Sequence, residues 1–116
     1  RILGDGDIKA DAGFGSTTSV YLPRAWIHYN HATDTLAESG NVSSVSDDGT
    51  GRITVNFTTN MPDNQYVIMG TASDASSFVP TILTPINLAN GSVEVQMVNL
   101  AGTLVDRENV MIAFLR

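Results

Sequence analysis

The 116-residue chain contains no cysteine and no long apolar run. Without cysteine there is no disulfide framework and no thiolate metal site, and cysteine usage gives no clue to the compartment. No apolar run approaches the roughly 18–20 residues that a membrane-spanning helix needs, and no signal-peptide pattern is visible. We therefore expect neither membrane insertion nor a fold held together by disulfides.

Basic residues are few: six Lys and Arg stand against twelve Asp and Glu, which gives a formal net charge of −6. A nucleic-acid-binding protein needs a clustered basic surface to displace counterions, and here the basic residues are scattered, so we expect no nucleic-acid partner. Charged residues make up 16% of the chain, against a typical value of ~25%. Ser, Thr and Asn take their place. Such a neutral polar surface suits a virion protein or a lectin, and it also fits an ordinary acidic β-domain.

Helical periodicity and helix-capping patterns are missing as well. The clearest element is residues 52–58, where Ile53, Val55 and Phe57 alternate with polar residues. Similar short segments recur at about 8–12-residue spacing, separated by polar turns. The predicted strands are 25–30, 36–38, 41–46, 52–58, 65–72, 92–99 and 109–115. The sequence thus predicts an all-β fold, an antiparallel β-sandwich of about seven to eight short strands.

Glycine and proline positions suggest how the chain is organised. Residues 1–23 are rich in Gly and Asp, which predicts an extended arm or the end of a fibre shaft, with a candidate short strand at 20–22. Residues 24–116 would form the sandwich. Pro80 and Pro85 predict an edge strand or irregular structure over 78–88, and Asn90-Gly91 predicts a type I′ hairpin. Because the chain begins with Arg rather than Met, we expect it to be part of a longer protein.

Several short blocks, in a consistent order, resemble the C-terminal domains of bacteriophage tail fibres. The blocks are RAWIHYN at 24–30, SGNVSSV at 39–45, GTG at 49–51, TVNFTT at 54–59, MPD at 61–63 and the closing strand VMIAFLR at 110–116. Residues 73–90 match nothing in that family, and His28 replaces the smaller polar residue expected there. The resemblance implies a trimeric virion protein at or near a fibre tip, without a defined ligand.

Two of the predicted strands are apolar on both faces. In 110–115, Met111 and Leu115 are apolar on the face opposite the one that alternation assigns to the core, and 66–69 behaves in the same way. Trp26 also lies opposite the core face of its strand. The second apolar face needs either loop cover from the same chain or a neighbouring subunit. Together with the resemblance, this predicts a homotrimer with Trp26, Met111 and Leu115 at the interface.

Metal and cofactor sites have weak support in the sequence. His28 and His31 could bind a metal with Asp34 or Glu38, or one histidine per chain could meet at a trimer axis. The spacing suits a helical turn better than a strand end, so we expect ordinary loop or surface histidines and no metal. The acidic clusters at 5–7 and 47–49 lack the EF-hand pattern and are better explained as Asx-turns. No cofactor is expected.

Catalytic motifs are also missing. Glycoside hydrolysis needs two opposed carboxylates, and nothing in the sequence pairs Glu38, Glu94 or Glu108. There is no nucleophile elbow, phosphate loop or dinucleotide fingerprint, and a Ser-His-Asp triad from any serine is uninformative. We therefore expect the protein not to be an enzyme.

The remaining function is recognition of a receptor by loops on a rigid sandwich. Tyr29 and Phe78 could serve as aromatic platforms, although either could equally be a core residue. The predicted receptor-binding residues are His31, Thr33, Asp34, Ser76, Ser77 and Phe78. A second candidate site is the polar face of strand 92–99, through Glu94 and Gln96.

These observations lead to one preferred hypothesis and two alternatives. The preferred one is an extracellular virion module, the distal domain of a trimeric phage tail fibre. It would attach to a host-surface glycan or protein receptor and contact other virion tail proteins. The alternatives are a purely structural module that trimerises or joins fibre segments, and a free oligomeric lectin.

Overall fold

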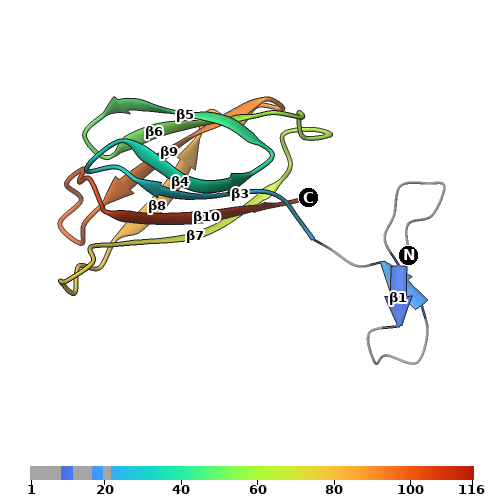
Figure 1. The fold of residues 1–116 in the computed structure, drawn as a ribbon, viewed down its shortest axis with the longest axis horizontal. Coiled ribbons are helices and arrows are strands. Elements are labelled where there is room, and N and C mark those ends of the chain that lie inside the picture. Colours follow the sequence, from blue (N-terminus) through green and yellow to red (C-terminus); the bar gives the residue numbers. More distant parts are fainter. Residues whose placement is uncertain (1–8, 12–16, 20–21) are drawn as a thin grey trace.

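The computed structural model describes residues 9–11, 17–19 and 22–116 of the chain. The all-β prediction is confirmed, because two four-stranded antiparallel sheets pack together as a sandwich (Figure 1). The first sheet has the order β4-β3-β10-β7, formed by β3 (Pro23–Asn30), β4 (Thr35–Gly40), β7 (Val67–Ser73) and β10 (Asn109–Leu115). The second has the order β5-β6-β9-β8, formed by β5 (Val42–Gly49), β6 (Arg52–Phe57), β8 (Ile82–Ile86) and β9 (Ser92–Val98).

The core lies between the two sheets and follows the predicted alternation. In β6, Ile53, Val55 and Phe57 are buried, while the residues between them are only half-buried. An aromatic cluster at one end of the core joins the sheets: the Phe57 ring lies edge-on to Phe114 and Tyr66, with ring centroids 5.2 and 5.7 Å apart. The other buried apolar residues are Ala25, Ile27, Tyr29, Met61, Ala72, Val93, Val95, Met97, Val110 and Ile112. Burial of these inner faces is the main source of stability.

The predicted type I′ hairpin at Asn90-Gly91 is wrong. Residues 87–91 link β8 to β9, and Asn87 (φ 51°) is the residue of this link with a positive φ. A type I′ turn needs positive φ at both central residues. Gly91 instead allows a close approach, since a Cβ built there would lie 3.1 Å from Oδ1 of Asn60. Contact with the neighbouring loop therefore overrides the local turn preference.

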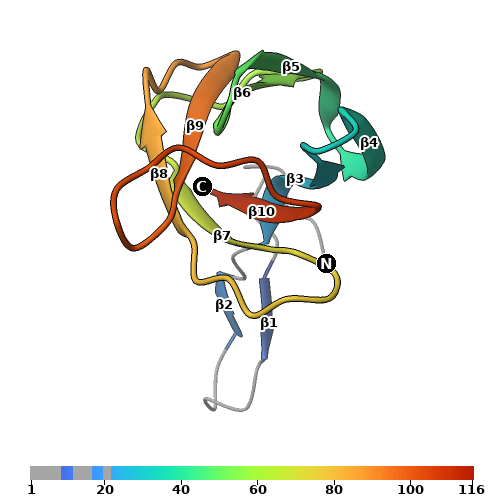
Figure 2. The ribbon, with the colours of Figure 1, turned by 90° about the vertical axis from the view of Figure 1, so that its left-hand side faces the viewer.

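The two ends of the sandwich differ. Leu115 pairs with Pro23, so the C-terminal strand ends where the N-terminal segment joins the sandwich (Figure 1). That segment carries the antiparallel pair β1 (Lys9–Asp11) and β2 (Thr17–Ser19). The strand predicted at 20–22 falls mostly outside the described residues. The links β3–β4, β5–β6, β7–β8 and β9–β10 all lie at the opposite end, here called the loop end (Figure 2). Among the described residues, no helix is long and apolar enough to cross a membrane.

A bidentate ion pair holds the C-terminal residue at the end opposite the loop end. Arg116 donates from Nε to Oδ1 of Asp63 at 2.9 Å and from a terminal nitrogen to Oδ2 at 2.7 Å. These bonds, with the backbone N–H of Gln65, lower the pKa of Asp63 to about 2. A guanidinium group that pairs with a carboxylate stabilises the ionised form of that carboxylate.

We expect NMR titration to give Asp63 a pKa of about 2, and Arg116→Gln to move it back towards 3.8. Because folding lowers this pKa, its contribution to stability is complete above the unfolded-state value and is lost as the pH falls through about 2. Arg52→Gln is the matched control, since Arg52 pairs with Glu94 and should leave Asp63 unchanged. An unaltered Asp63 titration in Arg116→Gln would contradict this assignment.

Candidate functional site

The loop end brings together three links that are far apart in the sequence. They are residues 31–34 after β3, residues 74–81 after β7 and residues 99–108 after β9 (Figure 2). Strands that alternate in direction place every second link at the same end. Both loops predicted to contact a receptor therefore lie at the same end. The third link was not among the predicted receptor contacts, because its residues form no recognisable motif.

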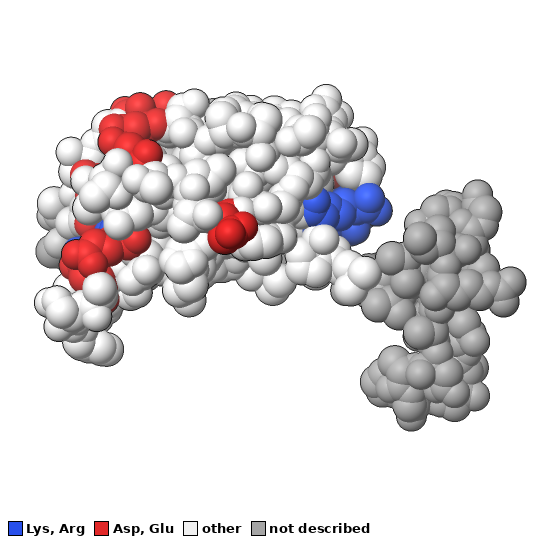
Figure 3. All heavy atoms as spheres, in the orientation of Figure 1, with Lys and Arg blue, Asp and Glu red and all other residues white. Residues whose placement is uncertain are grey.

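The loop end is acidic. Figure 3 shows acidic side chains gathered there and basic ones at the opposite end of the same face. The acidic residues in the links and strand ends are Asp34, Asp47, Asp48, Asp74, Asp106 and Glu108. Arg107 lies in the same region, but it is mostly buried and pairs with Asp74 at 3.3 Å. The field at this end therefore disfavours anionic ligands and favours cations.

His31 lies buried beneath these links. Its side chain is 1% exposed and its backbone N–H donates to the carbonyl of Arg107 at 2.9 Å. The imidazole faces three carboxylates. Its Nε2 is 3.0 Å from Oδ1 of Asp47 and 3.9 Å from Oδ1 of Asp34, and its Nδ1 is 3.2 Å from Oδ1 of Asp106. The predicted receptor contact of His31 is thus corrected, because the fold turns this side chain away from the surface.

The carboxylates around His31 are held by further hydrogen bonds. Tyr29 donates its hydroxyl to Oδ1 of Asp34 at 2.9 Å, and burial together with this bond raises the pKa of Tyr29. The backbone N–H of Gly49 donates to Oδ1 of Asp47 at 2.9 Å, which confirms the predicted Asx-turn there. The hydrogen bond with His31, and then the one from Gly49, lower the pKa of Asp47. The acidic cluster predicted at 5–7 lies outside the described residues.

His28 does not join His31. It is on the outer face of β3, where its Nε2 lies 3.2 Å from Oδ1 of Asn109. Glu38 is opposite His28 in the pairing of β3 with β4. Within the described ranges, the cluster able to hold a metal consists of His31, Asp34 and Asp47, so the histidine pair considered from sequence is not brought together.

The other predicted receptor residues lie on the surface of the loop end. Thr33 and Asp34 are exposed in the first link, and Ser76, Ser77 and Phe78 are exposed in the second. Phe78 is 95% exposed, so it is not a core residue. It borders two shallow depressions, one of about 320 Å³ shared with Ser77 and one of about 360 Å³ shared with Leu100 of the third link. The second candidate site, the polar face of strand 92–99, does not present Glu94 to a receptor, because Glu94 is buried and paired with Arg52.

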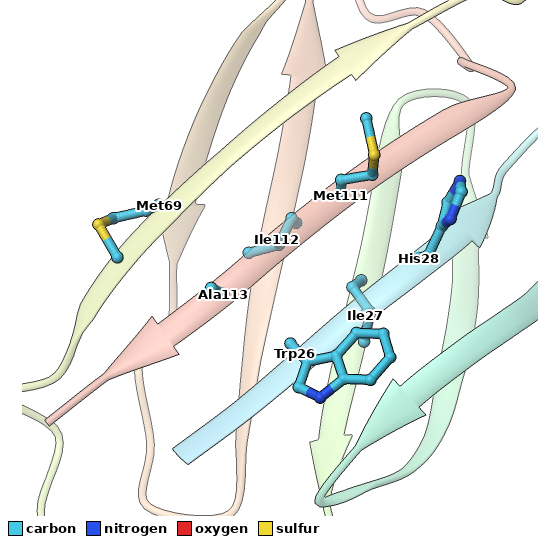
Figure 4. A pocket seen from close by; sticks show the side chains of 7 residues that line it. All are labelled: Trp26, Ile27, His28, Met69, Met111, Ile112 and Ala113. Carbon is cyan, nitrogen blue, oxygen red and sulfur yellow. The ribbon is translucent and has the colours of Figure 1, made fainter. Parts of the chain in front are cut away.

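An apolar surface covers the outer face of the sheet that contains β3, β10 and β7. Trp26, Met69 and Met111 line a depression of about 350 Å³ on this face (Figure 4). Trp26 and Met111 are each 42% exposed and Met69 is 48% exposed, so no loop of the described chain covers them. Leu115 lies further along β10 and is half-buried. We refer to Trp26, Met69 and Met111 as the outer apolar face.

Three features of the described residues thus bear on function: an acidic loop end, a buried histidine among carboxylates, and the outer apolar face. They have to be interpreted from their own geometry. Comparison of the chain with protein-family models, with curated proteins and with solved structures finds no match.

Proposed function

We propose that this chain is an adhesive module of a trimeric phage tail fibre. It would be located extracellularly in the virion and attach to a host-surface receptor. The observation that carries this proposal is the separation of the two ends of the sandwich. The N-terminal segment and the last strand meet at one end, while the links 31–34, 74–81 and 99–108 gather at the other. A tip module needs this arrangement, because one end joins the fibre and the other contacts the host.

The outer apolar face supports assembly into a trimer. Apolar side chains of this size are costly to leave in water, and an exposed contiguous group of them marks an interaction surface. Three copies around one axis would bury Trp26, Met69 and Met111 and point three loop ends in the same direction. Repetition of a weak site in one rigid assembly gives avidity, so a single loop end can bind weakly. Other virion tail proteins would contact the opposite end.

Phe78 is the best candidate to contact a receptor. It is an exposed aromatic side chain between two depressions, with hydroxyl groups of neighbouring serines beside it. An aromatic ring with nearby hydrogen-bonding groups suits an uncharged sugar, and the acidic surroundings disfavour an anionic one. A glycan is therefore the preferred receptor and a protein the second choice.

The test measures binding of the full chain to an array of bacterial surface glycans. Phe78→Ala should weaken binding at least about tenfold, which corresponds to about 1.4 kcal/mol. Leu22→Ala is the matched control, because Leu22 is also an exposed apolar residue but lies at the opposite end. Since both side chains are exposed, neither variant should change folding.

Two outcomes would favour the alternatives. A trimer that binds neither glycans nor host cells would support a purely structural trimerisation or joining module. Glycan binding by a protein that is not incorporated into virions would support a free oligomeric lectin. Equal binding by Phe78→Ala and the unmodified chain would remove Phe78 from the site.

A further inference from the structure

The surroundings of His31 cannot be satisfied by a neutral imidazole alone. A neutral imidazole carries one N–H, and an ionised carboxylate only accepts hydrogen bonds. Yet both ring nitrogens face carboxylate oxygens, at 3.0 Å for Nε2 and 3.2 Å for Nδ1. The Nδ1 contact lacks hydrogen-bond geometry, so Nδ1 has no hydrogen-bond partner among the described residues. A buried polar atom without a partner is costly, which indicates that a further charge belongs here.

The side of the ring that carries Nε2 has the geometry of a cation site. One ligand atom each from His31, Asp34 and Asp47 lies within 4.8 Å of the others. A cation bound about 2.0–2.2 Å from each atom would fit among them after small side-chain movements. It would also remove the repulsion between the two neighbouring carboxylates.

We propose that His31, Asp34 and Asp47 bind a divalent transition-metal ion of the zinc class. Nε2 of His31 and one carboxylate oxygen from each aspartate would be the ligands. The imidazole selects against Ca²⁺ and Mg²⁺, which prefer oxygen ligands alone. Three protein ligands leave at least one coordination position open. The side chains of Asp34 and Asp47 are 47% and 44% exposed, so these two ligands can be reached from solvent at the loop end.

Asp106 completes the arrangement from the third link. The backbone N–H of Gly51 donates to its Oδ1 at 2.8 Å and keeps the carboxylate next to Nδ1 of His31. Metal-binding histidines commonly donate their second N–H to a carboxylate, which fixes the ring tautomer. A small rotation of the Asp106 carboxylate would give its contact with Nδ1 this geometry. With the proton on Nδ1, the Nε2 lone pair is free for the metal. The site therefore joins the first and third links to the end of β5, and it stands independently of the receptor proposed above.

A doubly protonated imidazole is the competing explanation, since it would donate to Asp47 and Asp106 without any metal. The two explanations differ in what zinc does to the protein. Titration calorimetry of the chelator-treated full chain with ZnCl₂ should show one zinc ion per chain, unaffected by excess Mg²⁺. The melting temperature should rise with zinc concentration, because the ion binds only the folded state.

Variants identify the ligands. His31→Gln, Asp34→Asn and Asp47→Asn should each lower zinc affinity by more than the about 10–100-fold expected for an outer residue, and Asp106→Asn should fall within that range. His28→Gln and Asp48→Asn are matched controls, because neither residue belongs to the cluster. Both should bind zinc like the unmodified chain.

Two further measurements cover a variant that fails to fold. Asp34 is half-exposed, so Asp34→Asn should fold even if His31→Gln does not. In the unmodified chain, Co²⁺ should produce visible absorption bands, and zinc should shift the NMR signals of the His31 ring. Absence of zinc binding, or zinc binding by Asp34→Asn as tight as by His28→Gln, would overturn the proposal and leave the doubly protonated imidazole.

Discussion

Replacing Phe57 by alanine is expected to lower the free energy of unfolding by about 3–5 kcal/mol. Phe57 is 6% exposed and its ring contacts Phe114 and Tyr66, which belong to the opposite sheet and the segment leading into it. Truncation therefore removes a large buried surface and two edge-to-face contacts, and it leaves a cavity between the sheets. Urea unfolding followed by circular dichroism measures the change.

Thr54→Ala is the control for this prediction, because Thr54 lies in the same strand on its outer face. It loses a hydrogen bond to Asp48 at the surface, so its cost should be near the ~0.5–1.5 kcal/mol of a typical hydrogen bond. Equal effects of the two substitutions would mean that Phe57 does not join the sheets as described.

Sedimentation at micromolar concentration is expected to give a homotrimer of about 37 kDa, three times the 12.4 kDa of the chain. Met111→Glu should convert it to a monomer, because it places a charge from each chain in the centre of a desolvated interface. Met111 is 42% exposed in the single chain, so this change should leave the fold of each chain intact.

Leu100→Glu is the matched control for assembly. Leu100 is also an exposed apolar residue, but it lies in the third link and not on the outer apolar face. The Leu100→Glu variant should remain trimeric. A monodisperse monomer of the unmodified chain would contradict the trimer, and the outer apolar face would then need another partner.

The sequence by itself was sufficient to predict the fold class and which face of the central strands is buried. Alternation in 52–58 predicted which side of β6 is buried, and two-sided apolarity in 110–115 predicted a second apolar surface. Both inferences depend on the two-residue period of a strand, which is a local property of the chain. The edge position expected from Pro80 and Pro85 was also confirmed, since β8 is an edge strand.

Local preference failed where a distant segment decided the outcome. Asn90-Gly91 has the composition of a tight hairpin, but its carbonyls accept hydrogen bonds from the backbone N–H groups of Met61 and Phe57, and the chain forms a longer link there. Glu94 occupies a position that alternation assigns to the surface, yet its pairing with Arg52 and Asn87 allows it to be buried. A buried charge is tolerated only with such partners, and the sequence does not show which residues these partners are.

The candidate metal site is the clearest case of a feature decided by tertiary structure. His31, Asp47 and Asp106 are separated by 16 residues or more, and no spacing rule connects them. They meet because the strand order places the end of β3, the end of β5 and the β9–β10 link at one end of the sandwich. The two-residue period of a strand is encoded locally, whereas a site built from two links and the end of a strand depends on which strands become neighbours.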